Sequence, residues 1–292
     1  MTAGPLPDAL PGLLRAGDGV TVVSPAGPVP AGPLRAGLDL LAGWGLRARL
    51  APHAGDTHPD LPYLAGSDAD RARDFQDAWC DPGAAAVLCA RGGYGSARMV
   101  DLVDWERIAA APRKVFVGSS DTTVLHERLG RLGVPTWFGP MVATSAFVDD
   151  ATARERLRTA LFHGPTTLRG RTVAPGRARG TAVGGTVSLL GEHPPPDGAI
   201  AWLEDVGEAP YRLDRLLTGL LRSGWFDRVA GIVLGSWTDC GDAEVVLRER
   251  LGPLGVPVLG SVGFGHCPGQ HTVPLGVGVD LDADAGLVGV AP

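Results

Sequence analysis

The chain has 292 residues, 45% of them hydrophobic and 20% charged, which is ordinary for a globular protein of one large or two modest domains. The net charge of −6 gives no reason to expect nucleic-acid binding. Lys114 is the only lysine, so the sequence has no G-x-x-x-x-G-K-[ST] phosphate loop.

Residues 1–19 lack a basic region followed by an apolar core, and three prolines interrupt them, so no signal peptide is predicted. No apolar run is long enough to span a bilayer. The expected location is therefore the cytoplasm, without membrane association. The four cysteines are scattered without a C-x-x-C pair, which in a reducing compartment indicates free thiols.

Strand-like and helical segments alternate through the first half of the chain, as judged from apolar β-branched runs and longer amphipathic runs. The predicted strands are residues 19–25, 46–50, 84–90, 115–117 and 134–138, and the predicted helices are residues 34–44, 68–79, 122–132 and 150–162. Such alternation predicts a parallel sheet covered on both faces. Ligands bind at the carboxyl ends of such strands, where the loops 91–96 and 119–121 are expected.

The second half of the chain differs from the first in composition and in the pattern of its apolar residues. Residues 164–179 are rich in Gly, Pro, Thr and Arg without a sustained period, which predicts a linker with one short strand. The later elements are predicted strands at 199–203, 229–234 and 256–259, a strand-like stretch at 272–290, and a leucine-rich helix at 210–223. The expected organisation is an N-terminal α/β domain over residues 1–163, the linker over residues 164–179 and a C-terminal domain over residues 180–292.

The stretch VFVGSSDTTVL at residues 115–125 is the first candidate for a catalytic centre. A buried strand is followed by a glycine, small hydroxyl residues and Asp121, which can cap a following helix. A sharp strand-to-helix turn presents one side chain beside free backbone N–H groups. A serine nucleophile needs this geometry, a hydroxyl next to an anion-stabilising donor. The alternative is a capped helix in which the serines merely fit.

A serine nucleophile needs a base, and His266 follows a predicted strand in a loop rich in glycine and proline. A structural histidine bonded within its own turn is the alternative. The base in turn needs an acidic partner that stabilises its charged form, and Glu204 at the end of an apolar strand fits. Asp205 and Glu208 compete for this role, although Glu208 can instead pair with Arg212 four residues later.

Two further histidine patterns have plainer interpretations. His126 lies on the helix after the serine turn and is expected to pack there. His266, Cys267 and His271 offer ligands at zinc-like spacing, but no further partner appears at the spacing of a structural site. The sequence therefore predicts no metal and no cofactor.

Seven blocks of the sequence carry a further signal. They are VVSPAGP at 22–28, YLAGSDADRARDF at 63–75, ARGGYGSARMVDLVDW at 90–105, VGSSDTTVLH at 117–126, GGTVSLL at 184–190, WLEDVGEAPYRLDRLLTGLLRSG at 202–224 and GFGHCPGQHTVPLGVGVDLD at 263–282. In this order they resemble the LD-carboxypeptidase family of serine peptidases, which also contains the microcin C immunity peptidases. So many blocks in one order are far more specific than any single motif.

The resemblance implies a catalytic triad. The family pattern of Gly, an aromatic, Ser, Asp and, one residue later, Thr falls on residues 118–123, which implies Ser120 rather than Ser119 as the nucleophile. The acidic residue of the family's L-E-D block falls on Glu204, and the histidine of its G-H block falls on His266.

The resemblance also implies an oxyanion hole, formed by the backbone N–H of Asp121 and of Gly92 or Gly93. Two positions depart from the family pattern. Ser119 replaces the aromatic residue before the nucleophile, which would alter the shape of the pocket, and Thr186 replaces an Asn, which would alter a loop near the domain junction. Neither departure is expected to touch a member of the triad.

The implied fold is an N-terminal parallel-sheet α/β domain with the nucleophile, followed by a smaller strand-rich α/β domain with the Glu and the His, and with the active site between them. The implied protein is a cytoplasmic homodimer. The implied substrate is a murein tetrapeptide, cut between the L-centre of diaminopimelate and terminal D-Ala. Arg91 or Arg215 would pair with a carboxylate of this peptide, although structural ion pairs are an equal alternative.

Three other functions compete with this one. Hydrolysis of a peptidyl or aminoacyl nucleotide antibiotic is second, because only 6% of the residues are aromatic and stacking surface for a base is therefore scarce. A non-catalytic peptide-binding protein would lack a triad member. A glutaminase-like amidotransferase would carry Cys in place of Ser120.

Overall fold

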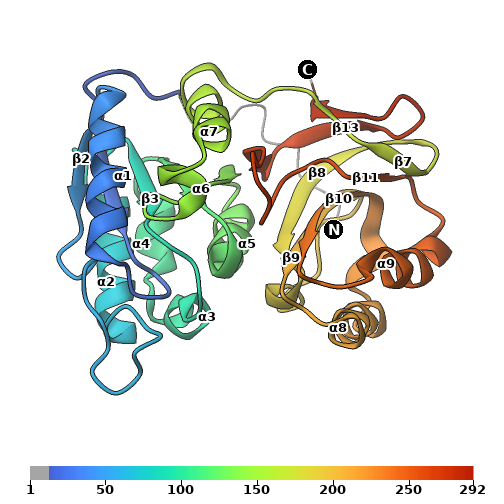
Figure 1. The fold of residues 1–292 in the computed structure, drawn as a ribbon, viewed down its shortest axis with the longest axis horizontal. Coiled ribbons are helices and arrows are strands. Elements are labelled where there is room, and N and C mark those ends of the chain that lie inside the picture. The colour runs from blue at the N-terminus through green and yellow to red at the C-terminus, as the bar shows by residue number, and fades with distance from the viewer. Residues whose placement is uncertain (1–12, 292) are drawn as a thin grey trace.

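The computed structural model describes residues 13–291 and shows two β-sheets side by side, each accompanied by helices (Figure 1). Residues 1–12, on which most of the signal-peptide prediction falls, and residue 292 lie outside the described residues. Within residues 13–291, no helix combines the length and the apolar character that crossing a membrane requires. The two sheets confirm the predicted α/β class, a parallel sheet followed by a strand-rich part.

The first sheet has six strands in the order β12-β5-β4-β3-β1-β2. The strands are β1 (Gly19–Val23), β2 (Arg47–Leu50), β3 (Ala86–Cys89), β4 (Val115–Gly118), β5 (Thr136–Phe138) and β12 (Val273–Leu275). All neighbours from β1 to β5 are parallel, and β12 pairs antiparallel with β5. The carboxyl ends of β3 and β4 therefore lie next to each other, where a parallel sheet forms its ligand crevice.

Helices cover both faces of this sheet. They are α1 (Ala31–Gly43), α2 (Asp68–Cys80), α3 (Ser96–Met99), α4 (Trp105–Ala110), α5 (Thr123–Arg131), α6 (Ser145–Val148) and α7 (Ala151–His163). Buried side chains of α2 and α5 pack with Phe116 on one face, and those of α1 and α7 pack with Val117 on the other. Because consecutive strand residues point to opposite faces, the uninterrupted apolar run of β4 suits a strand that is covered on both sides.

The second sheet has eight strands in the order β6-β14-β13-β8-β9-β10-β11-β7. The strands are β6 (Leu168–Arg169), β7 (Arg171–Ala174), β8 (Arg177–Thr186), β9 (Ala199–Val206), β10 (Val229–Thr238), β11 (Val258–Gly260), β13 (Gly278–Asp282) and β14 (Leu287–Val290). The strands from β8 to β11 are parallel, and the remaining pairs are antiparallel. Two helices, α8 (Pro210–Arg222) and α9 (Ala243–Leu251), pack on it through buried leucines.

Two segments differ from the expected organisation. The predicted linker, residues 164–179, contains β6, β7 and the first residues of β8. It forms strands because β6 pairs with β14 and β7 pairs with β11, both far along the chain. The strand β12, expected within the C-terminal domain, instead completes the first sheet. A shared apolar cluster also joins the two halves. In it the rings of Phe138 and Phe264 pack edge to face, with their centres 6.1 Å apart.

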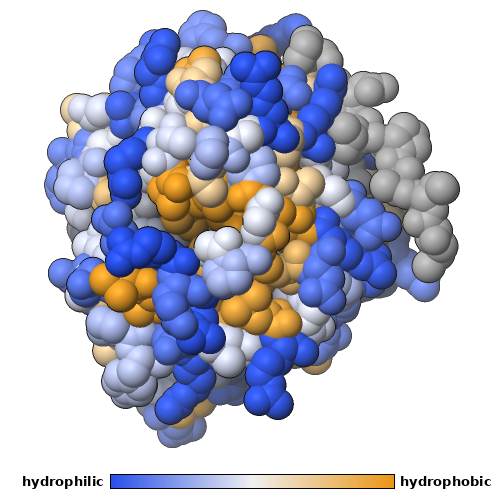
Figure 2. Space-filling model, turned by 90° about the vertical axis from the view of Figure 1, so that its right-hand side faces the viewer, coloured by the Kyte–Doolittle hydropathy of each residue, from blue (hydrophilic) through white to orange (hydrophobic). Residues whose placement is uncertain are grey.

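Apolar side chains gather in a hollow on the side of the molecule that carries the second sheet (Figure 2). On this sheet a groove of about 530 Å³ lies between α9 and the strands β7, β10 and β11. Val173, Leu247 and Val258 are among its lining residues, and Val173 is 40% exposed. The groove is separate from the strand ends where β3 and β4 terminate.

Candidate active site

The turn after β4 holds Ser120 in a backbone conformation that residues other than glycine rarely adopt. The φ angle of Ser120 is 57°, in the left-handed region, and this costs on the order of 1–3 kcal/mol. Thr122 donates from its backbone N and from Oγ1 to the Ser119 carbonyl, at 3.2 and 3.0 Å. Thr123 Oγ1 donates to the Ser120 carbonyl at 2.8 Å. With β4 before it and α5 after it, this is the strand–turn–helix arrangement that presents a nucleophile at its tip.

Ser120 and His266 line the same cleft, which has a volume of about 810 Å³. Gly92 and Gly93, in the loop after β3, line it as well. The cleft thus collects the ends of two neighbouring strands of the first sheet and a loop that follows β11 in the second. Segments that are far apart in the chain meet there because the two sheets pack against each other.

His266 is held by Glu204, a fully buried residue of β9. The imidazole Nδ1 lies 2.7 Å from Glu204 Oε2, and the backbone N–H of His266 donates to the same oxygen at 3.1 Å. Thr238 Oγ1 donates to the His266 carbonyl, which fixes the backbone from the other side. Because Nδ1 is engaged by the carboxylate, Nε2 is the ring nitrogen that can act on a hydroxyl or a ligand.

The charges around His266 favour its protonated form. Burial lowers the pKa of His266, but the hydrogen bond to Glu204 and the negative charges of Glu204 and Asp205 outweigh burial and leave the pKa above its usual value. Asp205 itself is buried, and burial raises its pKa to about 6 despite hydrogen bonds from the backbone N–H groups of Val206 and Ser188. A histidine stabilised in this way can accept a proton during a reaction and hold it.

Gly92 lies directly against the serine. A Cβ atom placed on Gly92 would be 2.9 Å from Ser120 Cβ and 3.1 Å from Ser120 Oγ. The next residue, Gly93, has a φ angle of 106°, which side-chain-bearing residues avoid. The paired glycines therefore allow the backbone of this loop to approach the hydroxyl.

Gly92→Ala is expected to lower kcat about 100-fold, because Ser120 or the loop must move by a few tenths of an ångström or more. Steady-state kinetics with the thermal midpoint measured alongside would check this. Gly219→Ala on α8 is the matched control, since its added Cβ would have no described atom within 4 Å apart from its chain neighbours and the adjacent backbone of its own helix. An unchanged kcat in Gly92→Ala would show that the close approach has no role.

The two arginines proposed from the sequence lie in different places. Arg91 lines the cleft, and its Nη1 donates to the Pro28 carbonyl at 2.8 Å. Arg215 lies on α8, with its guanidinium carbon 5.8 Å from the centre of the Tyr211 ring, and it is not part of the cleft lining. Of these two arginines, the structure places only Arg91 at the cleft, because α8 packs on the second sheet.

The competing acidic residues have other partners. Asp205 accepts a hydrogen bond from the backbone N–H of Ser188 at 2.8 Å. Glu208 pairs with Arg212 at 3.9 Å, as its spacing predicts. His126 is buried and packs as expected, with its ring nitrogens 2.7 Å from Thr136 Oγ1 and 3.1 Å from the Gly118 carbonyl oxygen. Burial lowers the pKa of His126 to about 4. None of these groups contacts His266 as Glu204 does.

Thr186 corrects one expectation. The position was expected to leave the triad untouched, but its hydroxyl donates to Glu204 Oε1. The reason is that the last residue of β8 lies opposite Glu204 of β9 in the parallel pair. Both carboxylate oxygens of Glu204 are therefore occupied, one by Thr186 and one by His266. Ser119, the other departure, is buried and lines the cleft.

Part of the cleft wall comes from the segment between β5 and α7, which sequence reasoning missed. Thr144 and Asp150 line the cleft there. Asp150 Oδ1 caps α7 by accepting two backbone N–H bonds at 3.0 Å, and Oδ2 accepts from the N–H of Gly269, in the loop of His266. The helix cap is readable from the sequence, but the bond to a residue 119 positions away is not. Among residues 13–291, no group of three or more His, Cys, Asp or Glu side chains is placed to hold a metal ion.

Comparison with known proteins identifies the family of the chain. Residues 20–139 match the model of the LD-carboxypeptidase N-terminal domain, and residues 176–281 match that of the C-terminal domain. A protein of Streptomyces coelicolor with a provisional carboxypeptidase name is 53% identical over 95% of this chain and 94% of its own. The murein tetrapeptide carboxypeptidase of Pseudomonas aeruginosa is 31% identical over 88% of this chain and 91% of its own.

A solved structure extends the likeness to the fold. The microcin C7 self-immunity protein MccF, in complex with aspartyl sulfamoyl adenosine, matches with a TM-score of 0.82 at 22% identity, over 97% of this chain and 98% of that one. At this identity the match concerns the fold. Two matching domain models and relatives aligned over nearly the whole chain show that the protein belongs to the LD-carboxypeptidase family and is a serine-type carboxypeptidase, a hydrolase.

Proposed function

We propose that the protein hydrolyses an L,D-peptide bond with Ser120 as nucleophile, His266 as general base and Glu204 as the partner of the histidine. The observation that carries this proposal is the buried Glu204 carboxylate bonded to His266 Nδ1, with His266 facing the cleft that Ser120 lines. The left-handed conformation of Ser120 supports it, because backbone strain of this kind clusters at active sites.

The steps follow from these positions. His266 Nε2 takes the proton of Ser120 as Oγ attacks the scissile carbonyl, and Glu204 stabilises the imidazolium. The backbone N–H groups of Asp121 and Gly93 hold the oxyanion, with Gly92 as the alternative donor. The C–N bond breaks, the leaving amine takes the proton from His266, and an acyl-serine remains. Water, deprotonated by His266, then hydrolyses the ester and restores the hydroxyl.

The substrate that we propose is a murein tetrapeptide, from which the enzyme releases terminal D-Ala during cell-wall recycling. The name of the Pseudomonas aeruginosa relative supports this choice. Arg91 supports it as well, since a cation at the cleft can pair with a carboxylate of such a peptide.

Hydrolysis of a peptidyl or aminoacyl nucleotide of the microcin C type is the second candidate, favoured by the fold shared with MccF. Stacking on an aromatic side chain is a common way to hold a nucleobase. Of the described residues that line the cleft, none is Phe, Tyr or Trp. The murein peptide therefore ranks first.

Mass spectrometry of the purified protein with murein tripeptide, murein tetrapeptide and an aminoacyl sulfamoyl adenosine tests the proposal. Release of D-Ala from the tetrapeptide alone is the expected result. Cleavage of the nucleoside conjugate alone would support the second candidate. Turnover of neither substrate would favour a peptide-binding protein that lacks activity.

We further propose a cytoplasmic homodimer, which the family resemblance implies. The apolar groove beside α9 supports self-association, because exposed apolar hollows of this kind often mark contact surfaces. Light scattering after size exclusion should give about twice the chain mass of 30.2 kDa. A mass of one chain at micromolar concentration would contradict the dimer.

A further inference from the structure

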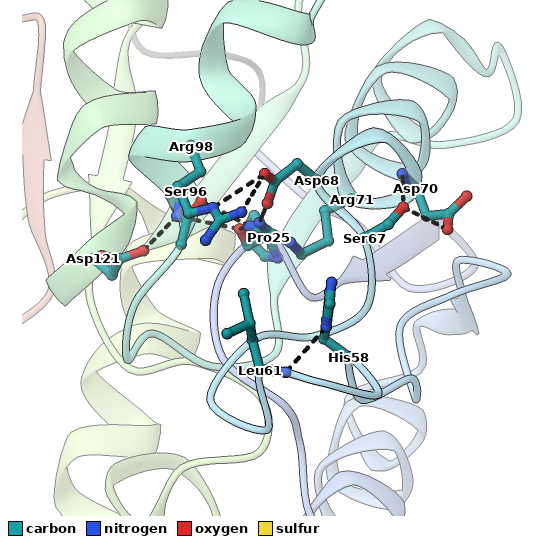
Figure 3. Close-up of polar contacts among 11 residues, drawn as sticks. Pro25, His58, Leu61, Ser67, Asp68, Asp70, Arg71, Ser96, Arg98 and Asp121 are labelled. Atoms are coloured by element: carbon teal, nitrogen blue, oxygen red, sulfur yellow. Dashed lines mark hydrogen bonds and ion pairs between the residues drawn. The ribbon is translucent and has the colours of Figure 1, made fainter.

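Arg71 is a buried arginine in the first turn of α2, with only 2% of its surface exposed. Its guanidinium donates to the carbonyl of Pro25 and to the carboxylate of Asp68 (Figure 3). It also donates to the carbonyl of Gly95 at 2.8 Å. Pro25 follows β1, and Gly95 belongs to the loop after β3. One cation therefore ties together two loops at the carboxyl edge of the first sheet.

Asp68 holds this cation in place. One of its oxygens accepts from Arg71, and the other accepts from Arg98 Nε and Nη2 at 3.0 and 2.9 Å. Arg98 lies on α3, which begins immediately after Gly95. The carboxylate thus neutralises Arg71 and links α2 to the helix that continues the loop, as Figure 3 shows.

A second set of bonds fixes the same end of the loop to the serine turn. Asp121, the residue after Ser120, accepts the backbone N–H of Ser96 at 2.7 Å through its buried carboxylate. The Ser96 hydroxyl lies 3.4 Å from the Pro25 carbonyl that Arg71 also binds. At the other end of the loop, the Gly27 N–H donates to the Gly92 carbonyl at 3.0 Å. Gly93 therefore lies between two hydrogen-bonded parts of the loop, the Gly92 carbonyl on one side and Gly95 and Ser96 on the other.

We propose that Arg71 is a positioning residue that sets the Gly93 amide relative to Ser120, an inference that rests on the proposed function. Arg71 touches no reacting atom. It acts by holding the Gly95 carbonyl, two residues from the oxyanion donor, at a fixed distance from the β1 loop. A planar guanidinium can satisfy two carbonyls and a carboxylate at once, whereas a lysine ammonium lacks the rigid fork that this requires.

The test compares Arg71→Lys with Arg73→Ala. Arg73 is the matched control, since it lies on the same helix and pairs with an aspartate three residues earlier, Asp70, but its side chain is 54% exposed. Arg71→Lys is expected to lower kcat about 10- to 100-fold with KM changed by less than about threefold, because a misplaced donor weakens transition-state binding alone. Asp68→Asn, which retains Arg71, is expected to lower kcat about 3- to 10-fold. Arg73→Ala should match the wild type.

Hydrogen exchange provides a readout that does not depend on catalysis. Amides of residues 91–96 are expected to exchange about tenfold faster or more in Arg71→Lys and at the wild-type rate in Arg73→Ala. Unchanged exchange and unchanged kcat in folded Arg71→Lys would overturn the inference. If the wild type neither cleaves the peptides nor is labelled at Ser120 by a fluorophosphonate, the proposed function fails, while exchange in the loop still decides the role of Arg71.

Discussion

Ser120→Ala is expected to lower kcat on the murein tetrapeptide by about a thousandfold or more, with little change in substrate affinity. The oxygen of this hydroxyl is the atom that becomes bonded to the acyl group in the proposed reaction. Single-turnover kinetics, with mass spectrometry to detect the acyl-serine, would check both the rate and the missing intermediate. Binding of the tetrapeptide, measured by calorimetry, should survive.

The matched control is Ser261→Ala. Ser261 has a φ angle of 58°, almost the same as Ser120, but it lines the groove beside α9 and not the cleft. This pair separates the loss of a nucleophile from the effect of changing a residue in a strained conformation. Wild-type turnover in Ser120→Ala would refute the assignment. Ser120→Gly should be inactive as well, yet more stable by about 1 kcal/mol, because glycine adopts this conformation without strain.

Glu204→Gln is expected to lower kcat by about a thousandfold or more, as removal of a triad carboxylate does. The substitution keeps the size of the side chain, so the buried site stays filled, but it removes the charge that stabilises protonated His266. Circular dichroism would establish that the variant is folded. Glu208→Gln is the control, since this carboxylate pairs with Arg212 near the end of the same strand and has no contact with the histidine.

The pH dependence of kcat/KM is a second measurement of the effect of Glu204→Gln. In the wild type, kcat/KM should rise with pH as His266 loses its proton, and the midpoint lies above the usual histidine pKa because Glu204 holds that pKa up. Without the charge, burial lowers the pKa, so the midpoint of the residual activity should move to lower pH. A profile with an unmoved midpoint would show that Glu204 does not govern the ionisation of the base.

Several elements could be predicted from local pattern. Leucines at helical spacing predict a helix over residues 210–223, and α8 occupies Pro210–Arg222 with Leu213, Leu217 and Leu220 buried. The apolar run before Gly118 predicts a buried strand, which is β4. Residues 164–179 could not be assigned in the same way, because β6 and β7 are short and acquire their stability from distant partners.

The role of Arg71 could not be found by pattern either. Arginines within a charged helix usually lie on the solvated face, and the same segment places Arg73 there. Arg71 is four residues before Phe75, and this spacing puts it on the buried face with that ring. The carboxylate of Asp68 and the carbonyls of Pro25 and Gly95, which two other loops supply, together allow a guanidinium to remain there.

The sequence by itself determined the α/β class, the strand-to-helix turn with its serines and the family, because these depend on residue types within short stretches and on their order. The family blocks already implied Glu204 as the acidic partner, but only the tertiary structure showed its contact with His266, the bond from Thr186 to the same carboxylate and the approach of Gly92 to Ser120. These pairs are 62, 18 and 28 positions apart. Contacts of this kind depend on how two sheets pack, and packing is a property of the whole folded chain.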